Sequence, residues 1–583
     1  MEQELITLGI LFFFALIGGI LATRFKQPML MGLLLVGAFI GPNMFGLVTN
    51  VNMIGMMIDF GAILMLFMIG LEFDLSKLRK IGLKAIVVGM LKSAVVVFVG
   101  FNIGLLLGLG VQTSLFIGII IAFSSTVVIV KILEEKELMN RQEVPLIIAV
   151  LIIEDILAVI ILTFFSGMMD KTAGMMGSIQ NLVISMCILV LAYMLFVKFI
   201  RPILVWVVKS NNSTESMTFL ALTLCAGFSY LAYYLKLSPA AGAFLAGSIV
   251  ASLPEAKRFE TAISPYNLII SSLFFIAIGT MVNFKSVEVN IMLILILVLT
   301  VIVTRLLAFG LIVYLFANFR GDKMFFSSMA MFSVGEFALL IAQEGQKFNV
   351  GIDLMSVSAA IIFITAVLMS LTLNHSDKLY SPASSGISYR FKKKLDSYSG
   401  YIRSISEELD LDNKYSQSLK KNLFRATISM LVVLLTIFGW RKLVTVMIQS
   451  EASIAAIMTG YLASLSIISI CLFYIIFKSR KVIKSLSEIF ANATNARSVM
   501  ESRKVVIRTF TAFALLGVAL IFPFIMFMID LKAIYVIISF ALIVIAFWEL
   551  HSLSPKKESG HDESFISNKK FEYNNKARNS WKI

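Results

Sequence analysis

Residues 144–165 form an apolar run that contains only three polar side chains, Thr163 and the adjacent acids Glu154 and Asp155. A helix of about 20 apolar residues crosses the hydrocarbon core of a bilayer, so this run predicts a membrane-spanning helix. A carboxylate at that depth is costly unless it is paired, hydrated or protonated. We therefore interpret the acidic pair as a cation or proton site. A polar pair that only packs helices together is the structural alternative.

The same apolar pattern recurs along the first 375 residues. The chain has 583 residues and is 59% hydrophobic, whereas soluble domains are about 45–50% apolar. The pattern predicts an all-α polytopic membrane protein of 13 helices in this region. The expected spans are 5–22, 29–46, 54–72, 85–108, 113–131, 144–165, 178–197, 214–235, 239–252, 264–282, 290–316, 323–344 and 352–373.

The charges in the connecting loops predict the topology. The odd-numbered connections carry sixteen Lys and Arg residues and the even-numbered connections carry four. By the positive-inside rule the odd loops are cytoplasmic, so the N-terminus is outside the plasma membrane and residue 375 is inside. Basic loops and tails beside anionic lipid also account for the net charge of +15 without a nucleic-acid partner.

The sequence indicates neither an enzyme nor a cofactor. Cys187, Cys225 and Cys471 lie in apolar runs without the spacing of a metal site or a disulfide framework. No nucleophile–base arrangement is evident either.

Three motif pairs indicate an internal repeat. G-A-F-I-G (37–41) resembles G-A-F-L-A-G (242–247), the segment 66–74 resembles 274–284, and A-F-S-S-T (122–126) resembles M-F-S-V-G-E (331–336). Partners are seven helices apart, so they cross the membrane in opposite directions. This order predicts two inverted repeats, spans 1–6 and 8–13, as in many secondary transporters.

The third motif pair predicts two broken helices that cross near the middle of the membrane. Ser124, Ser125 and Thr126 place hydroxyl groups in mid-span, where they can satisfy an unwound backbone and bind a cation. Glu336 follows Gly335 at the related point of span 12. Close helix packing is the alternative for the three hydroxyl residues. Glu336 is either an ion ligand or a structural partner of a half-helix dipole.

Two basic residues also fall within expected spans. Arg305 lies in the middle of span 11 and needs a carboxylate partner, for which Glu154 is the natural candidate. Lys92 lies in span 4, where it either reaches the cytoplasmic side or pairs with Asp59 or Glu72. We assign no role to Lys92.

Together these motifs resemble the Kef-type branch of the monovalent cation/proton antiporters, the cation:proton antiporter-2 family. The resemblance covers residues 5–375 and includes 59–72, 122–128, 242–247, 273–279, 333–338 and the Glu154-Asp155 pair. It implies a homodimer whose six-helix core moves like an elevator, with Na⁺ or K⁺ and H⁺ as substrates. It also implies that Asp155 binds the cation and the proton alternately.

The chain departs from the family at the acidic pair and in span 11. Potassium-efflux members commonly have Gln-Asp and electrogenic members have Asp-Asp with a helix-11 lysine, whereas this chain has Glu154-Asp155 and Arg305. Because arginine does not lose its proton in proteins, a Glu154–Arg305 pair would stay charged. The sequence therefore predicts electroneutral exchange of one proton for one cation at Asp155.

The chain after residue 375 predicts three further parts: a charged cytoplasmic linker (376–421), an accessory domain of about four transmembrane helices (422–551) and a polar, disordered tail (552–583). No G-x-G-x-x-G nucleotide-binding motif occurs there. A regulated potassium-efflux system, an organic-anion symporter and a membrane sensor are the alternative functions. Selectivity between Na⁺ and K⁺ does not follow from the sequence.

Overall fold

The computed structural model describes residues 2–380, apart from 168–212 and the positions 26, 73, 74, 236, 254, 318, 320, 349 and 377. Every regular element in this part of the chain is helical, and seven of these helices are long and apolar enough to cross a membrane. Helix α12, which bends by 47° near Pro265, makes an eighth when its two parts are one span. The expected all-helical membrane fold is confirmed at this level.

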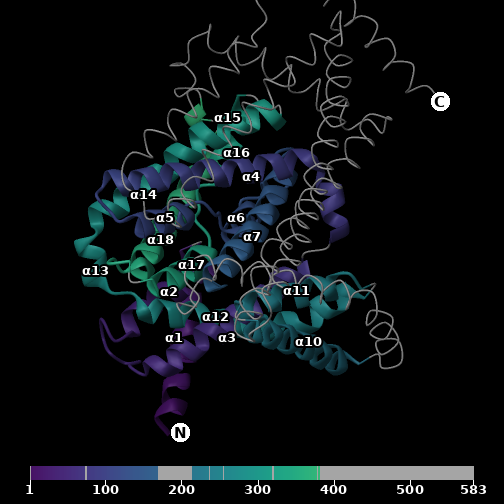
Figure 1. The fold of residues 1–583 in the computed structure, drawn as a ribbon, viewed down its shortest axis with the longest axis vertical. Helices are drawn as coiled ribbons and strands as arrows, with labels where there is room; N and C mark the ends of the chain where they lie inside the picture. Colours follow the sequence, from purple (N-terminus) through teal and green to yellow (C-terminus); the bar gives the residue numbers. More distant parts are fainter. Residues whose placement is uncertain are drawn as a thin grey trace, which may run out of the picture.

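The helices follow the chain in the order shown in Figure 1. Their bounds are α1 Glu2–Arg24, α2 Met29–Ile40, α3 Val51–Glu72, α4 Leu75–Leu106, α5 Val111–Ile120, α6 Thr126–Glu135, α7 Val144–Gly167, α10 Thr214–Tyr234, α11 Pro239–Ala251, α12 Ala256–Met281, α13 Phe284–Val289, α14 Ile291–Val303, η2 Thr304–Phe309, α15 Gly310–Ile312, η3 Val313–Ala317, α16 Asp322–Ala330, α17 Phe337–Gln346, α18 Leu354–Thr372 and η4 Leu373–His375. Segments η2 and η3 are π-helical turns within the rod that begins at α14.

Helix α4 covers most of the expected span 85–108, since its candidate membrane span is Lys84–Leu106, and it extends beyond this span at its N-terminal end. It begins at Leu75, ten residues before the expected start at residue 85, and continues for 32 residues. At 1.5 Å per residue this helix is about 48 Å long, which exceeds the hydrocarbon core of a bilayer. The expected span 178–197, the accessory domain 422–551 and the tail 552–583 lie outside the described residues, as does nearly all of the linker 376–421.

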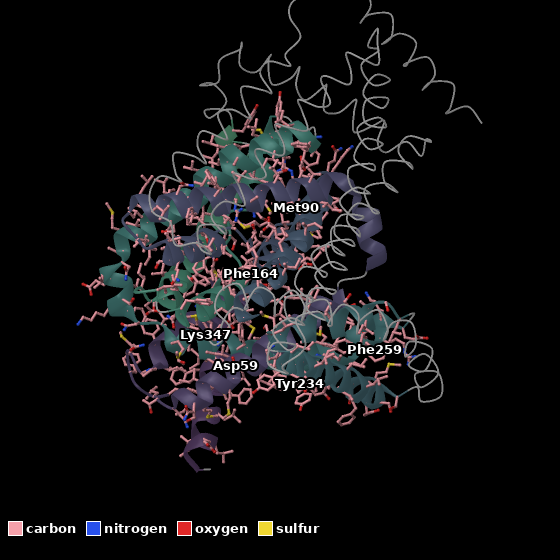
Figure 2. The ribbon with its side chains drawn as sticks, in the orientation of Figure 1. Asp59, Met90, Phe164, Tyr234, Phe259 and Lys347 are labelled. Carbon is pink, nitrogen blue, oxygen red and sulfur yellow. The ribbon has the colours of Figure 1, made fainter. Side chains whose placement is uncertain are left out.

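The described helices pack as two bundles, and the two halves of the chain contribute to both (Figure 1). One bundle, here called the scaffold bundle, contains α1, α2, α3, α10, α11 and α12. The other, here called the core bundle, contains α4 to α7 and α14 to α18. Side chains fill the space between the helices of each bundle (Figure 2).

The repeated glycine motifs allow close helix packing in the scaffold bundle. A Cβ atom on Gly37 would lie 2.3 Å from the carbonyl oxygen of Ile276 in α12. The glycine therefore lets the backbones of α2 and α12 approach each other, as small residues do in membrane helices.

Hydrogen bonds between described residues join the two bundles, among them one from Nε2 of Gln27 to Oγ of Ser370 at 3.4 Å. Gln343 of α17 donates from Nε2 to Oδ1 of Asp59 in α3 at 3.2 Å, and Figure 2 shows Asp59 at this boundary. The backbone N–H of Asn283 donates to Oγ of Ser356 at 2.8 Å. The boundary is therefore joined by single hydrogen bonds at separate points.

Candidate ion-binding site

Two interruptions of helical structure meet in the middle of the core bundle. The first separates α5 from α6 at residues 121–125, and the second separates α16 from α17 at residues 331–336. Ser124 and Val334 form an antiparallel bridge, in which Ser125 N donates to Ser333 O at 3.1 Å and Gly335 N donates to Phe123 O at 3.0 Å. The two segments thus satisfy some of each other's backbone groups.

Gly335 is required where these segments cross. A Cβ atom at this position would lie 2.7 Å from Ser124 O and 3.0 Å from Ser125 N. Both neighbours are backbone atoms, so neither can move aside without distorting the crossing.

We therefore expect Gly335→Ala to disturb both stability and transport. Overpacking of a well-packed site costs about 1–3 kcal/mol, and this strain falls on the backbone that holds the site together. Thermal unfolding in detergent should show a lower midpoint, and cation-driven proton flux in liposomes should fall. Gly227→Ala is the matched control, because no atom lies within 4 Å of a Cβ atom there. Equal stability and flux in the two variants would contradict this account.

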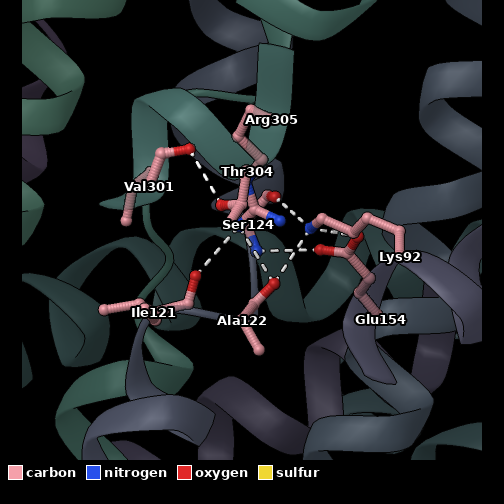
Figure 3. Close-up of polar contacts among 8 residues, drawn as sticks. All are labelled: Lys92, Ile121, Ala122, Ser124, Glu154, Val301, Thr304 and Arg305. Carbon is pink, nitrogen blue, oxygen red and sulfur yellow. Dashed lines mark hydrogen bonds and ion pairs between the residues drawn. The ribbon is translucent and has the colours of Figure 1, made fainter. Parts of the chain in front are cut away.

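Glu154 lies in the middle of α7, and both of its carboxylate oxygens have partners. The backbone N–H of Ser124 donates to Oε2 at 2.8 Å, and the ammonium of Lys92 in α4 pairs with Oε1 (Figure 3). The Glu154 and Lys92 side chains are fully buried. This pair corrects two expectations: Lys92 neither reaches the cytoplasmic side nor pairs with Asp59, and the cation that contacts Glu154 is not Arg305.

Arg305 binds backbone carbonyls instead. Its Nη2 donates to Ile121 O at 3.1 Å and to Ala122 O at 3.0 Å, at the C-terminal end of α5 (Figure 3). The side chain is fully buried, and Nε and Nη1 have no hydrogen-bond partner among the described residues. A cation at this place stabilises the negative end of the α5 dipole. The expected Glu154–Arg305 ion pair is therefore wrong.

Glu336 lies at the other end of the crossing. It occupies the N-cap position of α17, and Ser125 Oγ donates to its Oε2 at 2.9 Å. The same Ser125 oxygen accepts from Val128 N at 3.2 Å and so caps α6. The N-terminus of α6 thus has an oxygen partner, whereas the Glu336 side chain makes no capping hydrogen bond to α17. A carboxylate at the first turn of α17 is still favoured by the positive end of the helix dipole.

Asp155 faces a different environment from its neighbour Glu154. Thr126 Oγ1 donates to its Oδ2 at 3.1 Å, and the Asp155 residue keeps 7% exposure whereas Glu154 has none. Thr126 is half-buried at the start of α6. Of the two adjacent acids, Asp155 is therefore the less completely buried one.

Five buried charged residues converge on the crossing. They contact residues 121–126 and are Lys92, Glu154, Asp155, Arg305 and Glu336.

The structure thus brings all the expected site residues together and adds Lys92. The signal for Lys92 was already present, because a lysine within an expected span required a partner.

Comparison with known proteins identifies the family of the chain. The family model described as "Sodium/hydrogen exchanger, transmembrane" matches residues 11–375. A Na⁺/H⁺ antiporter of Enterococcus hirae is 30% identical over 57% of this chain and 87% of its own length. The glutathione-regulated potassium-efflux system protein KefC of Escherichia coli K12 is 32% identical over 57% of this chain and 53% of its own length.

Relatives that are named for a different substrate are also similar to this chain. The iron transporter MagA of Paramagnetospirillum magneticum is 26% identical over 64% of this chain and 84% of its own length. The family is shared among these proteins although their named substrates differ. From the match over residues 11–375, the chain belongs to the sodium/hydrogen exchanger family of cation/proton antiporters.

Proposed function

We propose that the protein is a secondary active antiporter that exchanges one monovalent cation, Na⁺ or K⁺, for one proton, with Asp155 binding the two alternately. The observation that carries this proposal is the difference between the two adjacent acids. Glu154 is enclosed by Lys92 and Ser124 and has no exposure, whereas Asp155 accepts a hydrogen bond from Thr126 and keeps 7% exposure.

Competition for one carboxylate couples the two fluxes. A bound cation favours the ionised carboxylate and a proton neutralises it, so Asp155 holds one or the other. An ionised, empty site crosses a bilayer poorly because an uncompensated charge is costly there. The loaded forms then carry cation one way and proton the other.

The buried charges support exchange of one proton for one cation. In their ionised forms, Lys92 and Arg305 are positive and Glu154, Asp155 and Glu336 are negative, so these five buried residues then have one excess negative charge. One proton or one monovalent cation neutralises this excess. Because Arg305 binds backbone carbonyls and not Glu154, this stoichiometry depends on the charge balance of all five residues.

Alternating access is proposed to occur by movement of the core bundle against the scaffold bundle. Each bundle draws helices from both halves of the chain, and the site lies wholly within the core bundle. We further propose that the chain has 13 spans, in which α5–α6 and α16–α17 each form one broken span. The N-terminus is proposed to lie outside, and the protein is proposed to be a homodimer in the plasma membrane.

A chemical cross-link between the bundles should stop this movement. In a background with Cys187, Cys225 and Cys471 replaced by Ala, Asp59→Cys and Gln343→Cys place one thiol on each side of the boundary. A short bis-maleimide should abolish flux in the double variant, while each single variant should keep its flux after the same treatment. Mass spectrometry verifies the link. Continued exchange by the linked protein would contradict a moving core.

The function itself is tested in liposomes that contain the purified full-length chain and a pH-sensitive dye. Stepping external Na⁺ and K⁺ separately should produce a proton flux with one or both cations. No proton flux with either cation would contradict the proposal and favour a symporter of another solute or a membrane sensor.

A further inference from the structure

The ammonium group of Lys92 is surrounded by oxygen atoms from three sources. Its Nζ donates to Ala122 O at 2.9 Å, to Ser124 Oγ at 2.8 Å and to Oε1 of Glu154. An ammonium has three N–H donors and no acceptor, so all three donors are used. The side chain is fully buried, and Figure 3 shows its tip pointing into the unwound segment after α5.

These oxygen atoms are of the kinds that bind monovalent cations in transporters. Carbonyls at the C-terminal end of a half-helix and in unwound backbone coordinate Na⁺, and carbonyl oxygens replace the hydration shell of K⁺. Here a carbonyl, a hydroxyl and a carboxylate converge on one point. That point is occupied by a positive charge that belongs to the protein itself.

The presence of Lys92 among these oxygen atoms changes the net charge of the buried residues. With Lys92 in place and every group ionised, the five buried residues have one excess negative charge, which one cation or proton neutralises. Without Lys92 the same residues would have two excess negative charges. Glu154 would then face the vacated position as an uncompensated carboxylate.

We propose that Lys92 acts as a built-in monovalent cation, which fills a second cation site formed by Ala122, Ser124 and Glu154 and thereby restricts transported cations to Asp155. This inference rests on the proposed function, because it presupposes a cation site at Asp155. Lys92 is a specificity-determining residue in this account, since it sets how many cations the site holds.

The test counts bound cations in the purified full-length protein with ²²Na⁺ and, separately, ⁸⁶Rb⁺ as the probe. The parent protein should bind one cation per chain, and Asp155→Asn should bind none. Adding Lys92→Met to Asp155→Asn should restore one bound cation, because Glu154 and the two neighbouring oxygen atoms become available. Adding Glu154→Gln as a third change should abolish that binding again.

The controls separate the two proposals. A parent protein that binds and exchanges neither cation contradicts the proposed function. A parent that binds one cation through Asp155, together with a folded Lys92→Met/Asp155→Asn variant that binds none, overturns the role of Lys92 alone. A structural role for Lys92 would lower stability in both Lys92 variants without restoring a binding site.

Folding of the Lys92 variants provides a second measurement. Lys92→Met and Lys92→Gln should be stabilised against heat by added Na⁺ or K⁺ more strongly than the parent is, because a free cation takes the place of the ammonium. If neither variant folds even at high concentrations of these salts, the vacated position does not accept a mobile cation and the inference is wrong.

Discussion

Replacing Asp155 with Asn should reduce cation-driven proton flux to that of protein-free liposomes. The amide has nearly the shape of the carboxylate and can still accept the hydrogen bond from Thr126 Oγ1, but it cannot be ionised or take up a proton. With Asp155 neutral, the remaining buried charges already balance and the site has no excess charge for a cation to compensate. Flux is measured with a pH-sensitive dye after steps of Na⁺ and K⁺.

The control for this variant removes the same charge elsewhere. Asp322 is the first residue of α16 and is exposed, so Asp322→Asn should keep the flux of the parent. Both variants should elute from a sizing column as the parent does. Flux through Asp155→Asn comparable to that of Asp322→Asn would mean that another group carries the proton.

The second large effect concerns the basic residue that forms the ion pair with Glu154. Breaking a buried ion pair by removing one partner costs about 3–5 kcal/mol, because the other charge is left buried without compensation. Lys92→Met should therefore lower the thermal midpoint strongly. Combining it with Glu154→Gln should recover much of that loss, since both charges of the contact are then absent.

A double-mutant cycle compares the two basic residues directly. The coupling energy of Glu154 with Lys92, which share a direct contact, should exceed that of Glu154 with Arg305. Thermal unfolding in detergent of the four proteins in each cycle gives both values. A larger coupling of Glu154 with Arg305 would restore the ion pair that the structure contradicts.

The failure to predict the Lys92 contact has a physical cause. The sequence places a charge along a helix but does not give the rotation of that helix about its axis. Lys92 is seven residues from the expected start of its span at residue 85, which is about 10 Å along a helix. The candidate membrane span of α4 begins at Lys84, so the depth of Lys92 was predictable. Its direction toward Glu154 depends on how α4 packs against α7, which the sequence does not give.

The error for Arg305 has a related cause. The residue lies in the π-helical turn Thr304–Phe309, and such a turn changes the angular register of all residues beyond it. A uniform helix of 3.6 residues per turn does not reproduce this geometry, and nothing in the apolar sequence around Arg305 marks the turn. Its carbonyl partners are backbone atoms, which no side-chain pattern reveals.

Other parts of the site were predictable because they depend on local order. The hydroxyl residues 124–126 and the segment 333–336 interrupt apolar runs at related points of a repeat, and the structure interrupts its helices there. Asp155 is also the less completely buried of the two adjacent acids. Local polarity and repeat symmetry therefore located the site, whereas tertiary packing decided which charged groups meet within it.

The central claim, that one carboxylate exchanges one monovalent cation for one proton, is tested most directly by measuring pH and membrane potential in the same liposomes. A Na⁺ or K⁺ gradient should drive a proton flux through the purified protein while a potential-sensitive dye records no change. A membrane potential generated by exchange, with the sign of net proton charge, would show that more than one proton moves per cation and would contradict the account.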